Sequence, residues 1–233
     1  MQNKTIEIKN RVTIDIRYSI RRYFVDKFFI ENISRFSDDA KILDIGGKKE
    51  KKRGMFNIAE YPLKVKYVNI DESTNPDYLC DAARIPVEND SFDGVILAEV
   101  LEHIKEPKAV LAESFRVLKS GGKLLVTVPF MFHVHADPCD YGRYTEHYFR
   151  EVLQEIGFQD VKIEKQGLFF GVLVNMIKFW VEEVINRNNT KKSIKYFYFW
   201  LVKKSFKWDD KKFVKNSNVL CNYTTGYGII CAK

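Results

Sequence analysis

The chain has 233 residues, 45% of them hydrophobic, and a formal net charge of +7, so it is long and apolar enough to bury one substantial core. It contains no uncharged run of about 18 residues and no apolar leader at the N-terminus, which argues against a membrane-spanning helix and against secretion. The four cysteines form no closely spaced pair, so we expect reduced thiols in a cytoplasmic protein.

The first half of the chain begins with a helical pattern and continues with strand patterns. Residues 14–36 repeat apolar side chains at helical spacing and predict an N-terminal helix. Short apolar runs then predict four strands, at 41–45, 65–70, 78–80 and 92–98. Residues 50–61, between the first two strands, lack a clean apolar stripe, so we expect the helix there to be short or distorted.

The second half alternates in the same way. Its pattern predicts a helix over 107–118 that stops at Gly121-Gly122, a strand over 124–128, a helix over 145–156 with Gly157 past its end, and strands at 161–163 and 226–231. Strands that alternate with helices predict an α/β fold, a parallel sheet with helices on both faces. Such sheets bind ligands beyond the carboxyl ends of their strands.

We expect a single domain in four parts. These are an N-terminal helical segment (1–38), a core (39–166), a helical insertion (167–218) and a final strand (219–233). The insertion is longer than an ordinary loop, and long insertions commonly serve recognition.

The insertion also carries the positive charge of the chain. Between Arg187 and Lys215 there are ten basic residues and only two acidic ones, interleaved with aromatic residues. Over 167–215 this mixture favours contact with an anionic membrane surface. It equally fits a helical cap whose aromatic side chains pack on the N-terminal helix, and basic aromatic segments also bind RNA.

Two acidic residues follow the first two predicted strands in a pattern suited to a nucleotide-like cofactor. The first strand leads into Asp44-Ile45-Gly46-Gly47, where a carboxylate lies next to backbone that a ligand can approach closely. A Gly-Gly pair after a strand is by itself also compatible with an ordinary turn. Asp71, at the end of the second strand, can accept hydrogen bonds from both hydroxyls of a ribose.

Five segments occur in the order typical of class I S-adenosylmethionine-dependent methyltransferases, at 41–47, 67–71, 81–86, 91–104 and 117–122. The chain resembles that family from about Lys41 to Ile163. The resemblance implies a Rossmann-like sheet of seven strands and S-adenosylmethionine as cofactor. By resemblance, the methionine part of the cofactor would contact Asp44, Gly46 and Gly47, the ribose Asp71, and the adenine Asp81 and Ala82, with Ala98 and Glu99 beside the methionine end.

One departure from the family pattern keeps a second hypothesis open. Lys48-Lys49-Glu50 stands where the family usually has its third glycine. A protein that binds the cofactor at a membrane without turnover is therefore the alternative to an enzyme.

The segment 128–145, after the fifth strand, resembles a branch of the family associated with bacterial glycan and surface-polysaccharide pathways. This resemblance implies an acceptor hydroxyl on a sugar or lipid-linked glycan, at the cytoplasmic face of the membrane. RNA and other small-molecule acceptors are the alternatives. RNA is disfavoured because Ala98-Glu99-Val100-Leu101 stands where base-amine methyltransferases often have an Asn-Pro-Pro-Tyr type motif.

The same segment supplies the candidate catalytic residues. Imidazoles titrate near neutral pH, so we assign His135 as the base that takes a proton from the acceptor. Asp140 would orient it, and Arg143 would bind an anionic group of the acceptor. Alternatively, His135 and Asp140 only fix the loop and Arg143 pairs with a neighbouring carboxylate.

We expect no metal site. His133 and His135 would be two ligands on an extended segment without a clear third. Glu102 and His103, in the segment resembling the family, are expected to be structural.

Overall fold

The computed structural model describes residues 2–50, 54–135, 138–188 and 192–233. The chain forms two compact units. The first contains residues 1–31, 130–132 and 165–226, and the second contains residues 32–129, 133–164 and 227–233.

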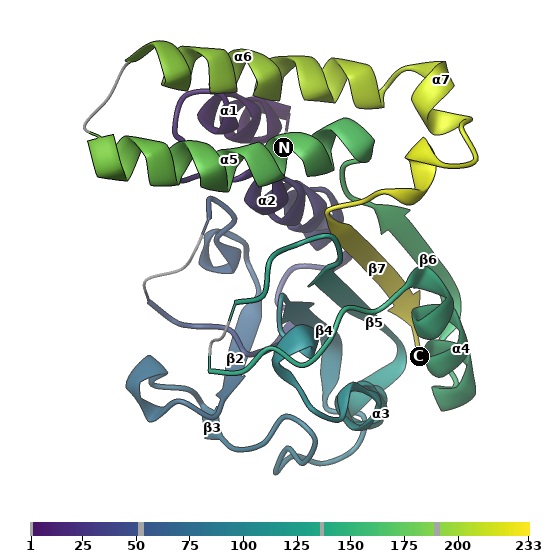
Figure 1. Ribbon diagram of the computed structural model, residues 1–233. Coiled ribbons are helices and arrows are strands. Elements are labelled where there is room, and N and C mark those ends of the chain that lie inside the picture. Colours follow the sequence, from purple (N-terminus) through teal and green to yellow (C-terminus); the bar gives the residue numbers. More distant parts are fainter. Residues whose placement is uncertain (1, 51–53, 136–137, 189–191) are drawn as a thin grey trace. The chain divides into compact units, whose positions relative to one another are not determined.

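The second unit is built on a seven-stranded sheet with the strand order β3-β2-β1-β4-β5-β7-β6 (Figure 1). The strands are β1 Lys41–Ile45, β2 Lys64–Asn69, β3 Tyr78–Leu79, β4 Phe92–Ala98, β5 Leu118–Pro129, β6 Gln159–Lys165 and β7 Gly226–Ala232. Every strand expected from the sequence is present, and the α/β, Rossmann-like fold class with seven strands is confirmed.

The sheet is mixed, which corrects the expectation of a purely parallel one. The pairs β1–β2, β1–β4, β2–β3 and β4–β5 are parallel. Figure 1 shows β7 running in the opposite direction to its neighbour β6. β7 begins at the end of the sheet where β6 finishes, so these two neighbouring strands are antiparallel.

In its described residues this unit has two α-helices, α3 Pro107–Val117 and α4 Glu146–Ile156. It also has the one-turn helices η1 Ile33–Arg35, η2 Ile58–Glu60, η3 Glu72–Thr74 and η4 Leu101–His103. Helix α4 has the predicted ends, because Thr145 Oγ1 accepts the N–H of Tyr148 and Gly157 adopts φ +113°. In the described residues between β1 and β2 only η2 is helical, in agreement with the short helix expected there.

Helix α3 does not stop at Gly121-Gly122 as expected; it ends at Val117, and both glycines lie inside β5. The backbone explains the difference. Gly121 N–H donates to the carbonyl of Lys233 and Lys233 N–H donates to the carbonyl of Gly122, each at 2.9 Å. These bonds tie the glycines to the end of β7, so they extend the strand rather than end the helix.

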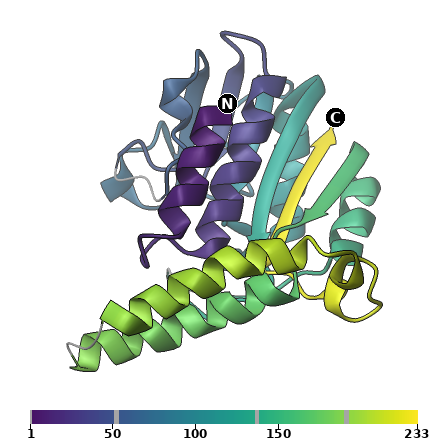
Figure 2. The ribbon, with the colours of Figure 1, turned by 90° about the horizontal axis from the view of Figure 1, so that it is seen from above.

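The first unit is helical, as expected for its insertion. It contains α1 Gln2–Val12, α2 Ile20–Asn32, α5 Phe169–Asn188, α6 Lys192–Asp209, α7 Lys212–Lys215 and the one-turn η5 Leu220–Asn222. Figure 2 shows α5 and α6 lying side by side along most of their length. None of the helices in the described part of the chain is long and apolar enough to cross a lipid bilayer.

The N-terminal segment forms two helices where the sequence predicted one over 14–36. Helix α2 begins only at Ile20, because Ser19 Oγ accepts the N–H of Arg22 at 3.0 Å and caps the first turn. Helix α1 escaped prediction because its sequence is mostly polar. Among its described side chains, Ile8 and Val12 are the buried ones.

The start of α5 is held by a carboxylate from the end of α6. Asp209 accepts the N–H groups of Leu168, Phe170 and Gly171 at 2.9, 2.9 and 3.0 Å. The first N–H groups of a helix have no partner within the helix, so this carboxylate caps it from a distance in sequence.

We predict that Asp209→Ala lowers the free energy of unfolding by about 1–2 kcal/mol, because three helix-start N–H groups lose their acceptor. Chemical denaturation followed by circular dichroism measures the loss. The control is Asp210→Ala, which removes an exposed carboxylate paired with Lys215 and should cost less than about 1 kcal/mol. Equal losses in the two variants would contradict the capping role.

Candidate functional site

The candidate cofactor residues lie along one edge of the sheet in the second unit. In the parallel register Ile45 is opposite Val68 and Leu97, and Ala98 is opposite Thr127. The carboxyl ends of β1, β2 and β4 are therefore level, and the loops that leave them are neighbours. This is the edge at which open α/β sheets bind their ligands.

The loop after β1 lies directly on the carboxylate of Asp44. A Cβ atom on Gly47 would overlap that carboxylate, and a Cβ on Gly46 would come within 2.6 Å of Val100 Cγ2. Gly46 also has φ +78°, which glycine adopts without strain. Neither position accommodates a side chain, and the backbone of Gly46 is exposed.

Asn69, at the end of β2, ties this loop down. Its Nδ2 donates to the carbonyl oxygens of Gly46 and Gly47 at 3.3 and 3.2 Å. We did not single out Asn69 in the sequence. The available signal was its position two residues before Asp71, at the end of a strand next to β1.

Lys48 and Lys49, which continue this loop, lie near the acidic residues Asp71 and Asp77. Lys49 Nζ lies 3.4 Å from Asp77 Oδ2. Hydrogen bonds from Ser73 lower the pKa of Asp71, and the positive charge of Lys48 lowers it further. The lysines that depart from the family pattern are thus accommodated beside β2 and β3.

Asp71 and Asp81 are exposed carboxylates oriented by tight turns. Asp71 Oδ1 accepts the backbone N–H of Ser73 at 3.0 Å and its hydroxyl at 2.6 Å, which caps η3. Asp81 Oδ1 accepts the N–H of Ala83 at 2.9 Å, and Ala82 between them is buried. Each turn fixes one carboxylate oxygen, so the direction of the carboxylate is set in advance.

Glu99 marks the end of β4 with an unusual backbone. Its φ is +57°, a left-handed conformation that residues other than glycine seldom adopt. Its N–H donates to the carbonyl of Thr127 in β5 at 3.0 Å, which ties the end of β4 to β5. Strained residues of this kind cluster at functional sites.

The structure brings His135, Asp140 and Arg143 together in the segment that follows β5. Asp140 Oδ2 accepts the backbone N–H of His135 at 2.9 Å and lies 3.4 Å from its Nδ1. Arg143 donates to both carboxylate oxygens of Asp140, with Nη2 at 2.7 Å from Oδ2. These arginine hydrogen bonds hold the pKa of Asp140 well below its usual range. Residues 136–137 lie outside the described part of this segment.

The contact of Arg143 with Asp140 is the pairing with a neighbouring carboxylate that the sequence left as an alternative. Arg143 also donates to the carbonyl oxygens of Gly142 at 2.8 Å and His133 at 3.0 Å. The guanidinium therefore holds the loop in place. Its hydrogen bonds to Asp140 raise the pKa of Arg143, and the negative charges of Glu102 and Glu99 raise it further.

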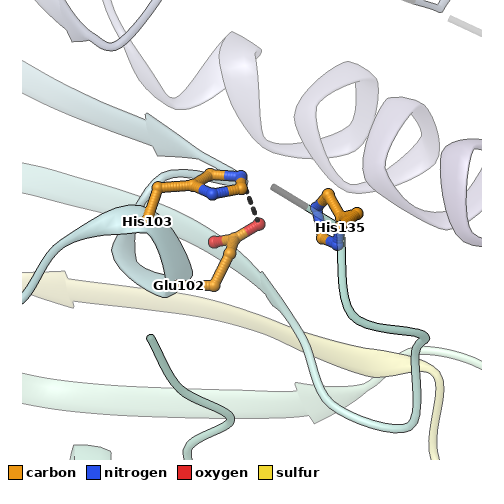
Figure 3. Close-up of side chains that lie close together, drawn as sticks. All are labelled: Glu102, His103 and His135. Carbon is orange, nitrogen blue, oxygen red and sulfur yellow. Dashed lines mark ion pairs between the residues drawn. The ribbon is translucent and has the colours of Figure 1, made fainter. Parts of the chain in front are cut away.

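Glu102 and His103, in η4, lie next to His135 (Figure 3). The backbone N–H of Tyr141 donates to the carbonyl of Glu102 at 2.7 Å, and His103 Nδ1 lies 2.5 Å from the carbonyl of Cys139. These bonds connect η4 to the loop that carries Asp140. We expected only a structural role for these two residues, because no local pattern predicts that the loop returns to η4.

Comparison with known proteins identifies a methyltransferase segment. Residues 55–126 match the model of the family described as "Methyltransferase domain". The ubiquinone biosynthesis O-methyltransferase of Idiomarina loihiensis is 34% identical over 109 residues, which cover 41% of this chain and 45% of the relative. The demethylmenaquinone methyltransferase of Renibacterium salmoninarum is 48% identical over 46 residues, 20% of this chain and 19% of that one. The chain spans less than half the length of these curated relatives.

Solved structures agree in fold. A SAM-dependent methyltransferase from Archaeoglobus fulgidus matches with a TM-score of 0.57 and 18% identity, over 91% of this chain and 94% of that one. Residues 55–126 are thus similar to methyltransferase domains, and the chain shares the fold of the Archaeoglobus fulgidus methyltransferase. The residues present fit S-adenosylmethionine, because the backbone of Gly46 and the carboxylates of Asp71 and Asp81 are exposed near the carboxyl ends of the strands.

We predict that Asp71→Ala weakens binding of S-adenosylhomocysteine by about tenfold or more, because hydrogen bonds to a charged group contribute about 1.5–3 kcal/mol. Isothermal titration calorimetry measures the affinity. Glu72→Ala, which removes the next exposed carboxylate along the chain, should leave it unchanged. If both variants bind as the unsubstituted protein does, Asp71 does not contact the ribose.

Proposed function

We propose that this protein transfers a methyl group from S-adenosylmethionine to a hydroxyl group of a small or lipid-linked acceptor. The observation that carries the proposal is the convergence of Asp44, Asp71 and Glu99 on the sheet edge that also receives the His135 loop. We assign Asp44, Gly46, Gly47, Asp71, Asp81, Ala82, Ala98 and Glu99 to cofactor binding, as the resemblance implies.

The residues of the chain would align the acceptor and accept its proton, while the cofactor supplies an activated methyl group when bound. His135 is the proposed base, and Asp140 positions it through its backbone N–H. Both terminal nitrogens of Arg143 donate to Asp140. We therefore propose that Arg143 mainly positions the loop, and not that it binds an anionic group of the acceptor.

For the acceptor we propose a sugar hydroxyl of a lipid-linked glycan, which rests on the resemblance of residues 128–145. A second candidate is a hydroxyl on a quinone-type ring. It is favoured by the partial similarity to the ubiquinone biosynthesis O-methyltransferase of Idiomarina loihiensis. Both acceptors join a polar ring to an apolar chain.

The surface of the first unit supports an amphiphilic partner. A pocket of about 490 Å³ there is lined by Thr13, Ile14, Lys195, Tyr196, Phe199, Trp200 and Lys203. Several large apolar side chains nearby in sequence are exposed, among them Met176, Trp180, Tyr196, Phe197 and Phe213. We propose that residues 167–215 contact an anionic lipid surface, although Lys191 of this segment lies outside the described residues.

We predict that His135→Ala lowers turnover by about 10²–10⁴-fold, the usual contribution of general base catalysis. Release of S-adenosylhomocysteine, measured over lipid-linked glycan, quinol, RNA and small hydroxyl acceptors, reports turnover and selects the acceptor. His147→Ala removes an exposed histidine of α4 and serves as the control. Tight cofactor binding without turnover on any acceptor would favour the non-catalytic alternative, and normal turnover of His135→Ala would remove the base.

We also predict that Lys195→Ala/Lys203→Ala weakens binding to vesicles of phosphatidylglycerol by about tenfold or more, since each lysine near an anionic surface contributes about 1 kcal/mol. Vesicle co-sedimentation measures the change. The control pair, Lys105→Ala/Lys162→Ala, removes two exposed lysines of the second unit and should bind as before. Equal binding to phosphatidylcholine vesicles, or no effect of the first pair, would contradict a role in lipid binding.

A further inference from the structure

Three side chains that can bind a metal ion converge in the second unit. Glu102 and His103 come from η4, and His135 comes from the loop after β5 (Figure 3). One ligand atom from each of the three lies within 4.8 Å of the other two. Glu102 Oε1 is 3.7 Å from His103 Nε2, and the two imidazole rings are nearly perpendicular, with centroids 5.0 Å apart.

The hydrogen-bond partners of the two imidazoles indicate which nitrogen carries the proton. His103 Nδ1 lies 2.5 Å from the carbonyl oxygen of Cys139, which can only accept, so Nδ1 holds the hydrogen. In the neutral ring, Nε2 then has its lone pair directed toward Glu102.

His135 follows the same rule. Its Nδ1 is 3.2 Å from the carbonyl oxygen of His133 and 3.4 Å from Asp140 Oδ2, and both of these atoms are acceptors. Nδ1 is therefore the donor, and Nε2 is the nitrogen with a lone pair. Histidines that bind metal ions generally donate their other N–H to a carbonyl or carboxylate in this way.

The electrostatic environment favours a cation at this point. The Glu102 side chain is only 1% exposed, and a buried carboxylate is costly unless positive charge lies nearby. The positive charge of Arg143 interacts with Glu102, but its two terminal nitrogens donate to Asp140. One guanidinium thus faces two carboxylates.

We propose that Glu102, His103 and His135 bind a divalent transition metal ion of the Zn²⁺ type. Two imidazole nitrogens and one carboxylate are a common zinc ligand set, with bonds of about 2.1 Å that place tetrahedral ligands roughly 3.4 Å apart. Only a small movement of the His135 side chain, which is 27% exposed, is needed to reach this spacing.

Three protein ligands leave a coordination position open, as in catalytic rather than structural zinc sites. Here the inference rests on the proposed function. The open position would take an acceptor hydroxyl, and the bound ion would ease its ionisation, with the proton leaving to water and the electron pair staying on oxygen. His135 then acts as a ligand instead of the base.

The test is metal binding by the full chain, prepared without a polyhistidine tag and freed of metal by chelation. We expect one equivalent of Zn²⁺ or Co²⁺ to bind, measured by calorimetry and by the Co²⁺ absorption spectrum. His135→Ala and Glu102→Gln should weaken binding by at least about tenfold, whereas His147→Ala should bind as the unsubstituted protein does. Because His135 lies on a loop, its variant keeps the test valid if Glu102→Gln fails to fold.

Absence of stoichiometric binding, or equal binding by His135→Ala and His147→Ala, would overturn the metal site. These measurements need neither acceptor nor cofactor. A chain that binds metal but methylates nothing would leave the metal site standing and remove the proposed function, and turnover without metal binding would do the reverse.

Discussion

The contact between the Asp44 carboxylate and the backbone of Gly47 is the constraint on which the candidate cofactor site depends. Since a Cβ on Gly47 would overlap the carboxylate, the loop must lie flat on the end of β1. Asn69 then binds the carbonyl oxygens of that loop and fixes it to β2. Asp71 follows two residues later, so its position relative to the loop is set by the same contact.

A second set of charges is arranged around Arg143. This guanidinium pairs with Asp140 and interacts with Glu102 and Glu99. Three carboxylates around one guanidinium give this neighbourhood a negative character, which would favour a metal ion there. The base and the ligand proposed for His135 are alternatives, because both use the lone pair of Nε2.

The first unit differs from the sheet in being built of helices, with polar pairs in its interior and aromatic side chains on its surface. Helix α2 makes buried polar pairs with neighbouring segments, Asp26 with Tyr18 and Arg21 with Gln166, while aromatic side chains of α6 are exposed. Phe197 and Trp200 stack at 6.0 Å, and Lys204 lies over the Trp200 ring. Exposed aromatic and basic groups held in this way suit an amphiphilic partner, while the buried pairs give the helices a defined arrangement.

The sequence by itself determined the strands and helices of the sheet unit, the strand-end positions of Asp44, Asp71 and Glu99, and the helical insertion, because local periodicity and strand-end residues are properties of short segments. It missed α1, whose few apolar residues make sense only against a partner, and it misjudged Gly121-Gly122, whose backbone bonds reach Lys233. Only the tertiary structure decided that Glu102, His103 and His135 meet and that Arg143 pairs with Asp140. Such contacts depend on how a loop returns to a distant turn, and no local pattern encodes that path.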